Sequence, residues 1–214
     1  MSGLSLDKLV VRRGAEVIVS LDAVVAPGEV LTIMGPSGSG KSTALAAIIG
    51  TLGRDFTLSG RLLLNGTDIT AQPTQSRGIG LLFQDDVLFP HMSVGANLAF
   101  ALPSALQGRR ARQEAVDAAL ARADLAGFAD RDPATLSGGQ RARVALLRTL
   151  LARPRALLLD EPFARLDTEL RARIRRFVLD RIREERLPAI LVTHDPDDAF
   201  AAGGPVIDPC GRAV

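Results

Sequence analysis

Short apolar runs separated by turns fill the first 34 residues of the chain. Their β-branched composition, with turns at Gly14 and Pro27-Gly28, predicts an antiparallel sheet that leads into a buried strand. Further on, two continuous apolar runs end at Asp160 and His194, as expected of buried parallel strands. The predicted strands are 9–11, 17–19, 30–33, 61–64, 79–83, 156–160 and 189–193, with a turn at Asn65-Gly66.

Helical patterns occupy most of the remaining chain. Residues 42–49 predict a helix that ends near Gly50, and residues 168–186 predict an amphipathic helix. Residues 94–130 are rich in alanine and mostly helical, with a break at 107–110 and a helix stop at Gly127. We interpret residues of about 90–150 as a helical subdomain inserted into a single α/β domain that spans residues 1–214.

Composition narrows the class of protein. The 214 residues are 47% apolar and 23% charged, which is the mix of a soluble globular domain. The sequence has no apolar run that could span a membrane, and its first residues lack the pattern of a signal peptide, so a cytoplasmic location is expected. The net charge of +2 is too small to indicate a nucleic-acid partner, and the arginines at 171–176 indicate a solvated helix face.

One segment between a predicted strand and a predicted helix carries glycines, a lysine and a serine at a fixed spacing. Glycines let backbone N–H groups turn inward around a phosphate chain, and the helix adds its positive N-terminal end. Lys41 would bring a compact charge to the β- and γ-phosphates, and Ser42 would offer a hydroxyl to Mg²⁺. The segment is Gly35-Pro36-Ser37-Gly38-Ser39-Gly40-Lys41-Ser42, followed by Thr43. It predicts Mg-ATP binding and a P-loop NTPase fold with a RecA-like core and an N-terminal antiparallel β subdomain.

Further candidate motifs lie at the ends of predicted elements. Leu136-Ser137-Gly138-Gly139-Gln140 precedes a helical run and forms a second anion-binding end, although by itself an ordinary N-cap explains it equally well. Asp160-Glu161 comes twenty residues after Gln140, and His194 comes thirty-four residues after Asp160. Taken singly, Glu161 fits a solvated acid and His194 fits a histidine with a structural hydrogen bond.

In this order the motifs resemble those of the ATP-binding subunit of ABC transporters, over roughly residues 4–200. The resemblance also includes a glutamine after a strand, Phe83-Gln84, and the loop Ala164-Arg165-Leu166-Asp167. The segments 83–85, 136–147 and 156–167 are most similar to the short YnjD-like importer-type ATPases.

The resemblance implies a role for each motif in binding and hydrolysing ATP with Mg²⁺. Asp160 would hold the metal through water, and Gln84 would contact the metal and the attacking water. Glu161 would polarise this water, and His194 would hydrogen-bond the γ-phosphate. General-base assistance of this kind is worth about 10²–10⁴-fold in rate.

The resemblance also implies partners. Two copies of the chain would form a head-to-tail dimer around two ATP molecules, because the transition state needs donors that the phosphate loop lacks. The residues that would complete the partner's site are Ser137, Gly138, Gly139, Gln140 and Asp167. Integral membrane permease subunits would dock at residues 84–97, beside Phe83 and including Phe89, Pro90 and Met92. An importer would add an extracytoplasmic solute-binding protein and a place on the inner face of the cell membrane.

The sequence departs from the pattern of ABC ATPases in two ways. It has no Tyr or Trp and its first Phe is Phe56, so the aromatic residue that usually stacks on adenine is missing before the phosphate loop. Our hypothesis is that Arg12 or Arg13 stacks on the base instead, with weak discrimination between ATP and GTP. The sequence also continues only about twenty residues beyond His194, so we expect no C-terminal regulatory β-domain.

The leading interpretation is the ATP-hydrolysing subunit of an ABC membrane transporter, and the resemblance favours an importer. A soluble ABC-type ATPase that acts on ribosomes or nucleic acid is the alternative, opposed by the single phosphate loop and the lack of heptad runs. A small nucleotide kinase is opposed by the Leu136–Gln140 motif. The transported solute is not encoded in this chain, because specificity would reside in other subunits.

Overall fold

The computed structural model describes residues 3–84, 87–164 and 166–214. Asp85 and Arg165, which belong to the motifs named above, lie outside the described residues. The described chain forms two compact units. The first unit comprises the residues up to Leu81 together with Arg155–Glu161 and Arg175–Val214, and the second comprises Leu82–Pro154 together with Pro162–Ile174.

An antiparallel sheet forms the N-terminal part of the first unit, as predicted. Its order is β2-β1-β4-β5, and β1 pairs with both β2 and β4 along almost its whole length. These strands are longer than the apolar runs that predicted them, because backbone hydrogen bonds extend the ladder through polar residues. The bounds are β1 (Leu4–Arg13), β2 (Glu16–Val25), β4 (Thr57–Leu64) and β5 (Thr67–Asp68).

A second, parallel sheet has the order β6-β7-β8-β3-β9. β8 pairs in parallel with both β3 and β7, so the carboxyl ends of these three strands lie at one edge. Both buried strands predicted from continuous apolar runs are confirmed, whereas β9 was not predicted. The bounds are β3 (Val30–Met34), β6 (Ile79–Leu82), β7 (Ala156–Asp160), β8 (Ala189–Thr193) and β9 (Val206–Ile207).

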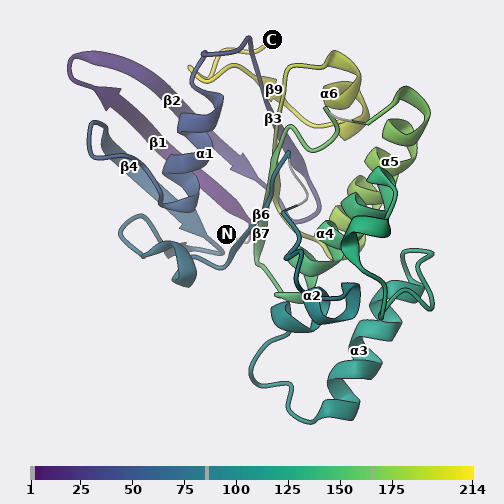
Figure 1. Ribbon diagram of the computed structural model, residues 1–214. Coiled ribbons are helices and arrows are strands. Elements are labelled where there is room, and N and C mark those ends of the chain that lie inside the picture. The colour runs from purple at the N-terminus through teal and green to yellow at the C-terminus, as the bar shows by residue number, and fades with distance from the viewer. Residues whose placement is uncertain (1–2, 85–86, 165) are drawn as a thin grey trace. The chain divides into compact units, whose positions relative to one another are not determined.

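Helix α1 (Lys41–Ile49) contacts both sheets and is central to the core of the first unit (Figure 1). Ile48 is fully buried in the same cluster as Val11 of β1 and Leu158 of β7. Burial of a side chain of this size stabilises a fold by about 1.5–3 kcal/mol. The core therefore fixes the position of the loop that precedes α1.

The carboxyl end of α1 is held by a buried arginine that follows the 3₁₀ turn Thr74–Ser76. Arg77 is 4% exposed, and its guanidinium donates to the carbonyl oxygens of Ala47 and Ile48 at 2.9 and 2.7 Å. It also donates to the carbonyl oxygens of Thr70 and Gln72, and burial lowers its pKa. The side chain thus satisfies last-turn carbonyls that a helix leaves without partners.

The second unit is mostly helical. It contains α2 (Val94–Ala101), α3 (Arg109–Ala121), the 3₁₀ turn Pro133–Thr135, α4 (Gly138–Leu151) and the start of α5 (Thr168–Glu184). The predicted stop at Gly127 is wrong, because α3 already ends at Ala121 and Gly127 lies in a later turn with φ of 78°. The predicted break at 107–110 is partly wrong, since Arg109 and Arg110 already belong to α3.

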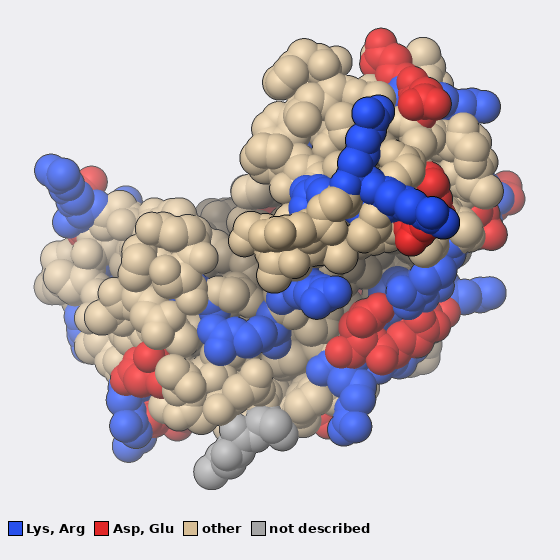
Figure 2. Space-filling model, turned by 90° about the horizontal axis from the view of Figure 1, so that it is seen from below, with Lys and Arg blue, Asp and Glu red and all other residues tan. Residues whose placement is uncertain are grey.

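A short C-terminal helix, α6 (Pro196–Ala202), completes the described elements of the first unit. No helix within the described ranges has both the length and the apolar composition needed to cross a membrane. On the face shown in Figure 2, basic and acidic side chains lie next to one another. Charges of both signs are therefore mixed on that face, as the small net charge of +2 leads one to expect.

Candidate active site

The phosphate-loop segment lies between β3 and α1, which is the structural context that the motif requires. Gly38 and Gly40 have φ angles of 80° and 102°, which favour glycine. A Cβ at Gly40 would lie 2.8 Å from the carbonyl oxygen of Ile18. Gly40 is the N-cap of α1 and offers it no side-chain cap, so the first N–H groups of the helix are available to an anion.

Lys41 points its ammonium group back into the loop. Its side chain is 7% exposed, and Nζ donates to the carbonyl oxygens of Gly35 and Pro36 at 2.7 and 2.8 Å. The same nitrogen lies 4.0 Å from Oε1 of Glu161. A concentrated positive charge is therefore held between the loop and the end of β7.

Glu161 and His194 come from the ends of neighbouring parallel strands and meet directly. Oε2 of Glu161 lies 3.1 Å from Nδ1 of His194. The N–H of Glu161 donates to the carbonyl oxygen of Val192 at 2.9 Å, and its φ is 44°. The backbone therefore turns sharply after β7, and the two side chains converge outside the carboxyl ends of the strands, where α/β sheets bind ligands.

Asp160 precedes Glu161 at the end of β7. Its pKa is raised by burial and then by the charge of Glu161, and the charge of Lys41 opposes these effects. Two adjacent carboxylates with incomplete compensation are suited to a cation. In the described parts of the chain, no three His, Cys, Asp or Glu side chains cluster as a ready-made metal site. Mg²⁺ typically takes one or two carboxylates together with phosphate oxygens and water.

A cavity of about 330 Å³ in the first unit opens beside the loop. Arg13 lines it as predicted, together with loop residues and Glu161. Glu16, Ile18 and Phe56 also line it and were missed, since they are distant in sequence from the loop. The full lining is Arg13, Glu16, Ile18, Ser37, Gly38, Gly40, Lys41, Ser42, Thr43, Phe56 and Glu161.

Ser137, Gly138, Gly139 and Gln140 belong to the second unit and begin α4. Oγ of Ser137 accepts from the N–H of Gln140, and Oε1 of Gln140 accepts from the N–H of Ser137, which is a complete capping box. A Cβ at Gly139 would lie 2.4 Å from Cδ1 of Leu170 in α5. The ordinary N-cap is therefore confirmed, and the anion-binding role of this helix end stays a prediction.

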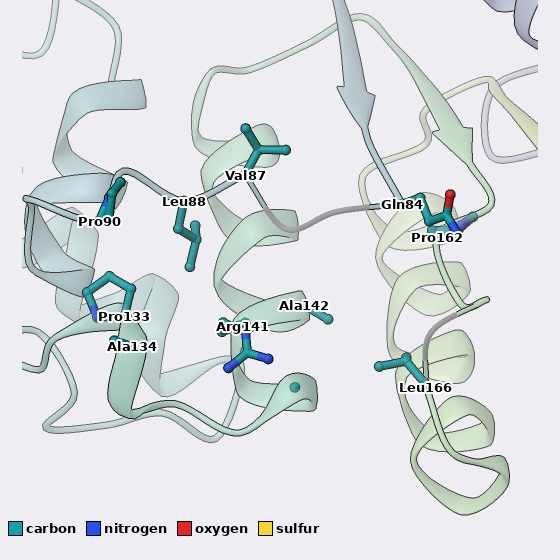
Figure 3. Close-up of a pocket in the computed structure, with 11 residues that line it drawn as sticks. Gln84, Val87, Leu88, Pro90, Pro133, Ala134, Arg141, Ala142, Pro162 and Leu166 are labelled. Carbon is teal, nitrogen blue, oxygen red and sulfur yellow. The ribbon is translucent and has the colours of Figure 1, made fainter.

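Gln84 and Asp167 also belong to the second unit. Gln84 is exposed and lines a cavity of about 420 Å³ with Gly138, Pro162 and Leu166 (Figure 3). Asp167 is exposed, and its Oδ1 accepts from the N–H of Leu170 at 3.0 Å near the start of α5. The predicted site residues therefore form two groups, one within each unit.

A parallel sheet, a glycine loop before α1 and acidic residues at the end of a neighbouring strand define the first unit as a P-loop nucleotide-binding core. The profile of the ABC transporter family matches residues 19–164. The chain therefore belongs to the ATP-binding proteins of ABC transporters, a family whose members hydrolyse ATP to power transport.

Individual relatives agree with this family. The chain is 51% identical to the ABC transporter ATP-binding protein YnjD of Escherichia coli K12 over 187 residues, which cover 87% of this chain and 86% of YnjD. It is 40% identical to the Fe(3+) ions import ATP-binding protein FbpC 1 of Rhizobium meliloti over 190 residues, and this match spans only 53% of that relative. The solved structure of cbiO1 from Clostridium perfringens, part of the ABC transporter complex cbiONQ, has a TM-score of 0.84 at 28% identity and covers the whole chain and 87% of cbiO1.

Proposed function

We propose that this ATPase drives solute import, with Mg-ATP bound on the phosphate loop and hydrolysed with help from Glu161. The observation that carries the proposal is the convergence of Lys41, Glu161 and His194 at one edge of the parallel sheet. Lys41 would bind the β- and γ-phosphates, Glu161 would orient the attacking water, and His194 would hold the γ-phosphate. The loop glycines and Ser37, Ser39 and Thr43 would supply backbone and hydroxyl donors to the phosphates.

For the metal, we propose Ser42, Asp160 and Gln84 as ligands, directly or through water. Hydroxyl, carboxylate and amide oxygens are the hard ligands that Mg²⁺ accepts alongside phosphate oxygens. The metal would neutralise charge on the phosphates when bound. The raised pKa of Asp160 supports this role, because a carboxylate whose charge is poorly compensated gains most from a cation.

We further propose that a second copy of the chain completes each ATP site with Ser137, Gly138, Gly139, Gln140 and Asp167. Ser137, the N-cap of α4, is exposed, and the positive end of a helix favours an anion such as a γ-phosphate, which supports this arrangement. Two chains would then pair head to tail around two ATP molecules, and Asp167 would lie at their interface.

Docking on permease subunits is proposed for the surface around residues 84–97. Phe83 and Phe100 are 49% and 66% exposed, and Phe89 packs edge-to-face on Phe100 with ring centroids 5.1 Å apart. Asn97 is buried and bonds to the backbone of Phe89, Met92 and Ser93, so the part of this surface at residues 89–97 is held in place. Rigid aromatic surfaces suit a partner helix. The chain would then lie on the inner face of the membrane.

Import is favoured over export by the relatives, since FbpC is named as an import protein. A solute-binding protein outside the membrane would deliver the cargo to such a complex. Co-purification of the tagged chain with integral membrane proteins, reduced by Phe100→Ser, would support docking.

Mixing of two inactive variants tests the composite site. Lys41→Ala removes the ammonium group of the phosphate loop. Ser137→Asn replaces the hydroxyl proposed to contact the partner's ATP but keeps a side chain that can cap the helix. Each variant alone should lose Mg-dependent ATP hydrolysis. A mixture should recover part of it, because a mixed dimer has one site with both halves intact. Mixed dimers, detected by two different tags, that show no recovery would contradict the head-to-tail arrangement.

A further inference from the structure

Three residues lie in a row across the end of the antiparallel sheet. Arg13 of β1 pairs with Glu16 of β2. On the other side of β1, Arg12 pairs with Thr57, the first residue of β4, and Phe56 directly precedes Thr57 in the chain. Directly opposed residues in an antiparallel ladder point to the same face of the sheet.

This face is the one that packs on α1. Alternate residues along β1 and β4, such as Val11 and Leu62, are fully buried in the cluster that contains α1. Phe56 is half-buried against that cluster. The row thus continues the core face beyond its buried part, where all three residues line the same cavity as Ser42 and Thr43.

One part of the cavity wall therefore carries the groups proposed to bind phosphate. Another part carries the ring of Phe56, the guanidinium of Arg13 and the carboxylate of Glu16. Among the described residues that line the cavity, Phe56 is the one aromatic residue. We propose that Phe56 supplies the ring on which the base of the bound nucleoside triphosphate stacks, with Arg13 as a second planar contact and Glu16 as an acceptor for the amino group of the base. This rests on the proposed ATP site, and it moves the stacking role from an arginine to Phe56.

A single tryptophan tests the position of the base. The chain contains no Trp, so Phe56→Trp would introduce a unique fluorophore into the cavity. ATP should change its emission, whereas inorganic tripolyphosphate, which has no base, should change it little. Phe200→Trp is the matched control, because Phe200 in α6 is 89% exposed and does not line the cavity. Equal responses of Phe56→Trp to ATP and tripolyphosphate would overturn the proposal.

Affinities measured by calorimetry give a second readout. Phe56→Leu keeps an apolar side chain against the core but removes the ring. It should weaken ATP binding roughly 10-fold or more, as expected for a lost base–aromatic stack, and leave tripolyphosphate binding unchanged. Unchanged ATP affinity in Phe56→Leu would refute the stacking role while leaving the ATPase proposal intact. Failure of the wild-type chain to bind either compound would instead refute the ATP site itself.

Discussion

Nδ1 of His194 lies 3.1 Å from Oε2 of Glu161, although 33 residues separate the two in sequence. The contact joins the ends of β7 and β8, two strands of the same parallel sheet. It orients the carboxylate, whose other oxygen is 4.0 Å from Nζ of Lys41. The Glu161 carboxylate is therefore held between the ammonium group of Lys41 and the imidazole of His194, and these two contacts help to fix its direction.

Substitution of Glu161 should separate binding from turnover. Glu161→Gln keeps the shape of the side chain but removes the proposed general base, so ATP hydrolysis should fall by about 10²–10⁴-fold while ATP still binds. His194→Ala should also slow hydrolysis, because it frees the carboxylate and removes the proposed γ-phosphate contact. Steady-state phosphate release and equilibrium binding measure both effects. Glu114→Gln, on the exposed face of α3, is the control and should keep full activity; unchanged turnover in Glu161→Gln would remove Glu161 from its role.

Asp160 should lower the stability of the nucleotide-free chain, although we propose it as a ligand of the metal. Burial and the neighbouring charge of Glu161 both disfavour its ionised form. Asp160→Asn should therefore raise the Tm of the nucleotide-free chain at pH 7, and it should reduce hydrolysis by about 10²-fold or more. Thermal unfolding without Mg²⁺ or nucleotide is the measurement. A lower Tm in the variant would show that Lys41 already compensates the charge in full.

Gly139 is constrained by packing as well as by its motif. An added Cβ would overlap Leu170, and overpacking of this kind costs about 1–3 kcal/mol, which exceeds the gain in helix propensity of about 1 kcal/mol. Gly139→Ala should thus lower the free energy of unfolding by roughly 1 kcal/mol. In a Leu170→Ala background the same change should become stabilising. Urea titration of the four chains completes the cycle, and additive effects would exclude the contact.

Arg77 should contribute far more to stability than an exposed arginine. Arg77→Met would leave four carbonyl oxygens without their donor, two of them at the end of α1. Each unsatisfied buried group costs about 1–3 kcal/mol, so the total loss should be about 3 kcal/mol or more. Arg61→Met removes a solvent-accessible ion pair with Asp7 and should cost about 0–1 kcal/mol. Similar midpoints of urea unfolding for the two variants would contradict this difference.

The lowered pKa of Asp208 predicts that the stability contributed by this residue depends on pH. Burial opposes its charge, but hydrogen bonds from Arg212 and from the N–H of Cys210 outweigh this and hold its pKa below the ordinary 3.8. A lowered carboxyl pKa stabilises the fold above the ordinary value, and this stability is lost as pH falls through the lowered one. Asp208→Asn should therefore be less stable than the wild type at pH 7, and the difference should shrink below about pH 3.8. A difference that does not change with pH would exclude this charge as the cause; Asp180→Asn on α5 is the control.

The strands that sequence predicted best are those buried on both faces. The apolar runs at 156–160 and 189–193 coincide with β7 and β8, because nothing polar interrupts such strands. β1 and β2 extend beyond their apolar runs to Arg13 and Glu16, since ladder hydrogen bonds do not require apolar side chains. Two-residue β9 has too little sequence to carry a pattern.

The residues of the candidate site also fall into those that the sequence alone could identify and those that it could not. Chemistry concentrated in one segment, such as Gly35–Ser42, is visible in the sequence because its spacing is local. Phe56 was not found, because its place beside Arg13 depends on the register between β1 and β4. The roles assigned to Gln84, Ser137 and Asp167 stay predictions, since they depend on a second chain or on the bound nucleotide.

Glu161 is also where the chain leaves the first unit, since Pro162 begins the next segment of the second. The peptide bond between them is planar, and proline fixes its own φ near about −65°. The residue before a proline is restricted as well, so Glu161, whose φ is 44°, has few other backbone conformations open to it. Its N–H is also bonded to the carbonyl oxygen of Val192. The direction of the carboxylate is therefore set as much by the course of the main chain as by the side chain itself.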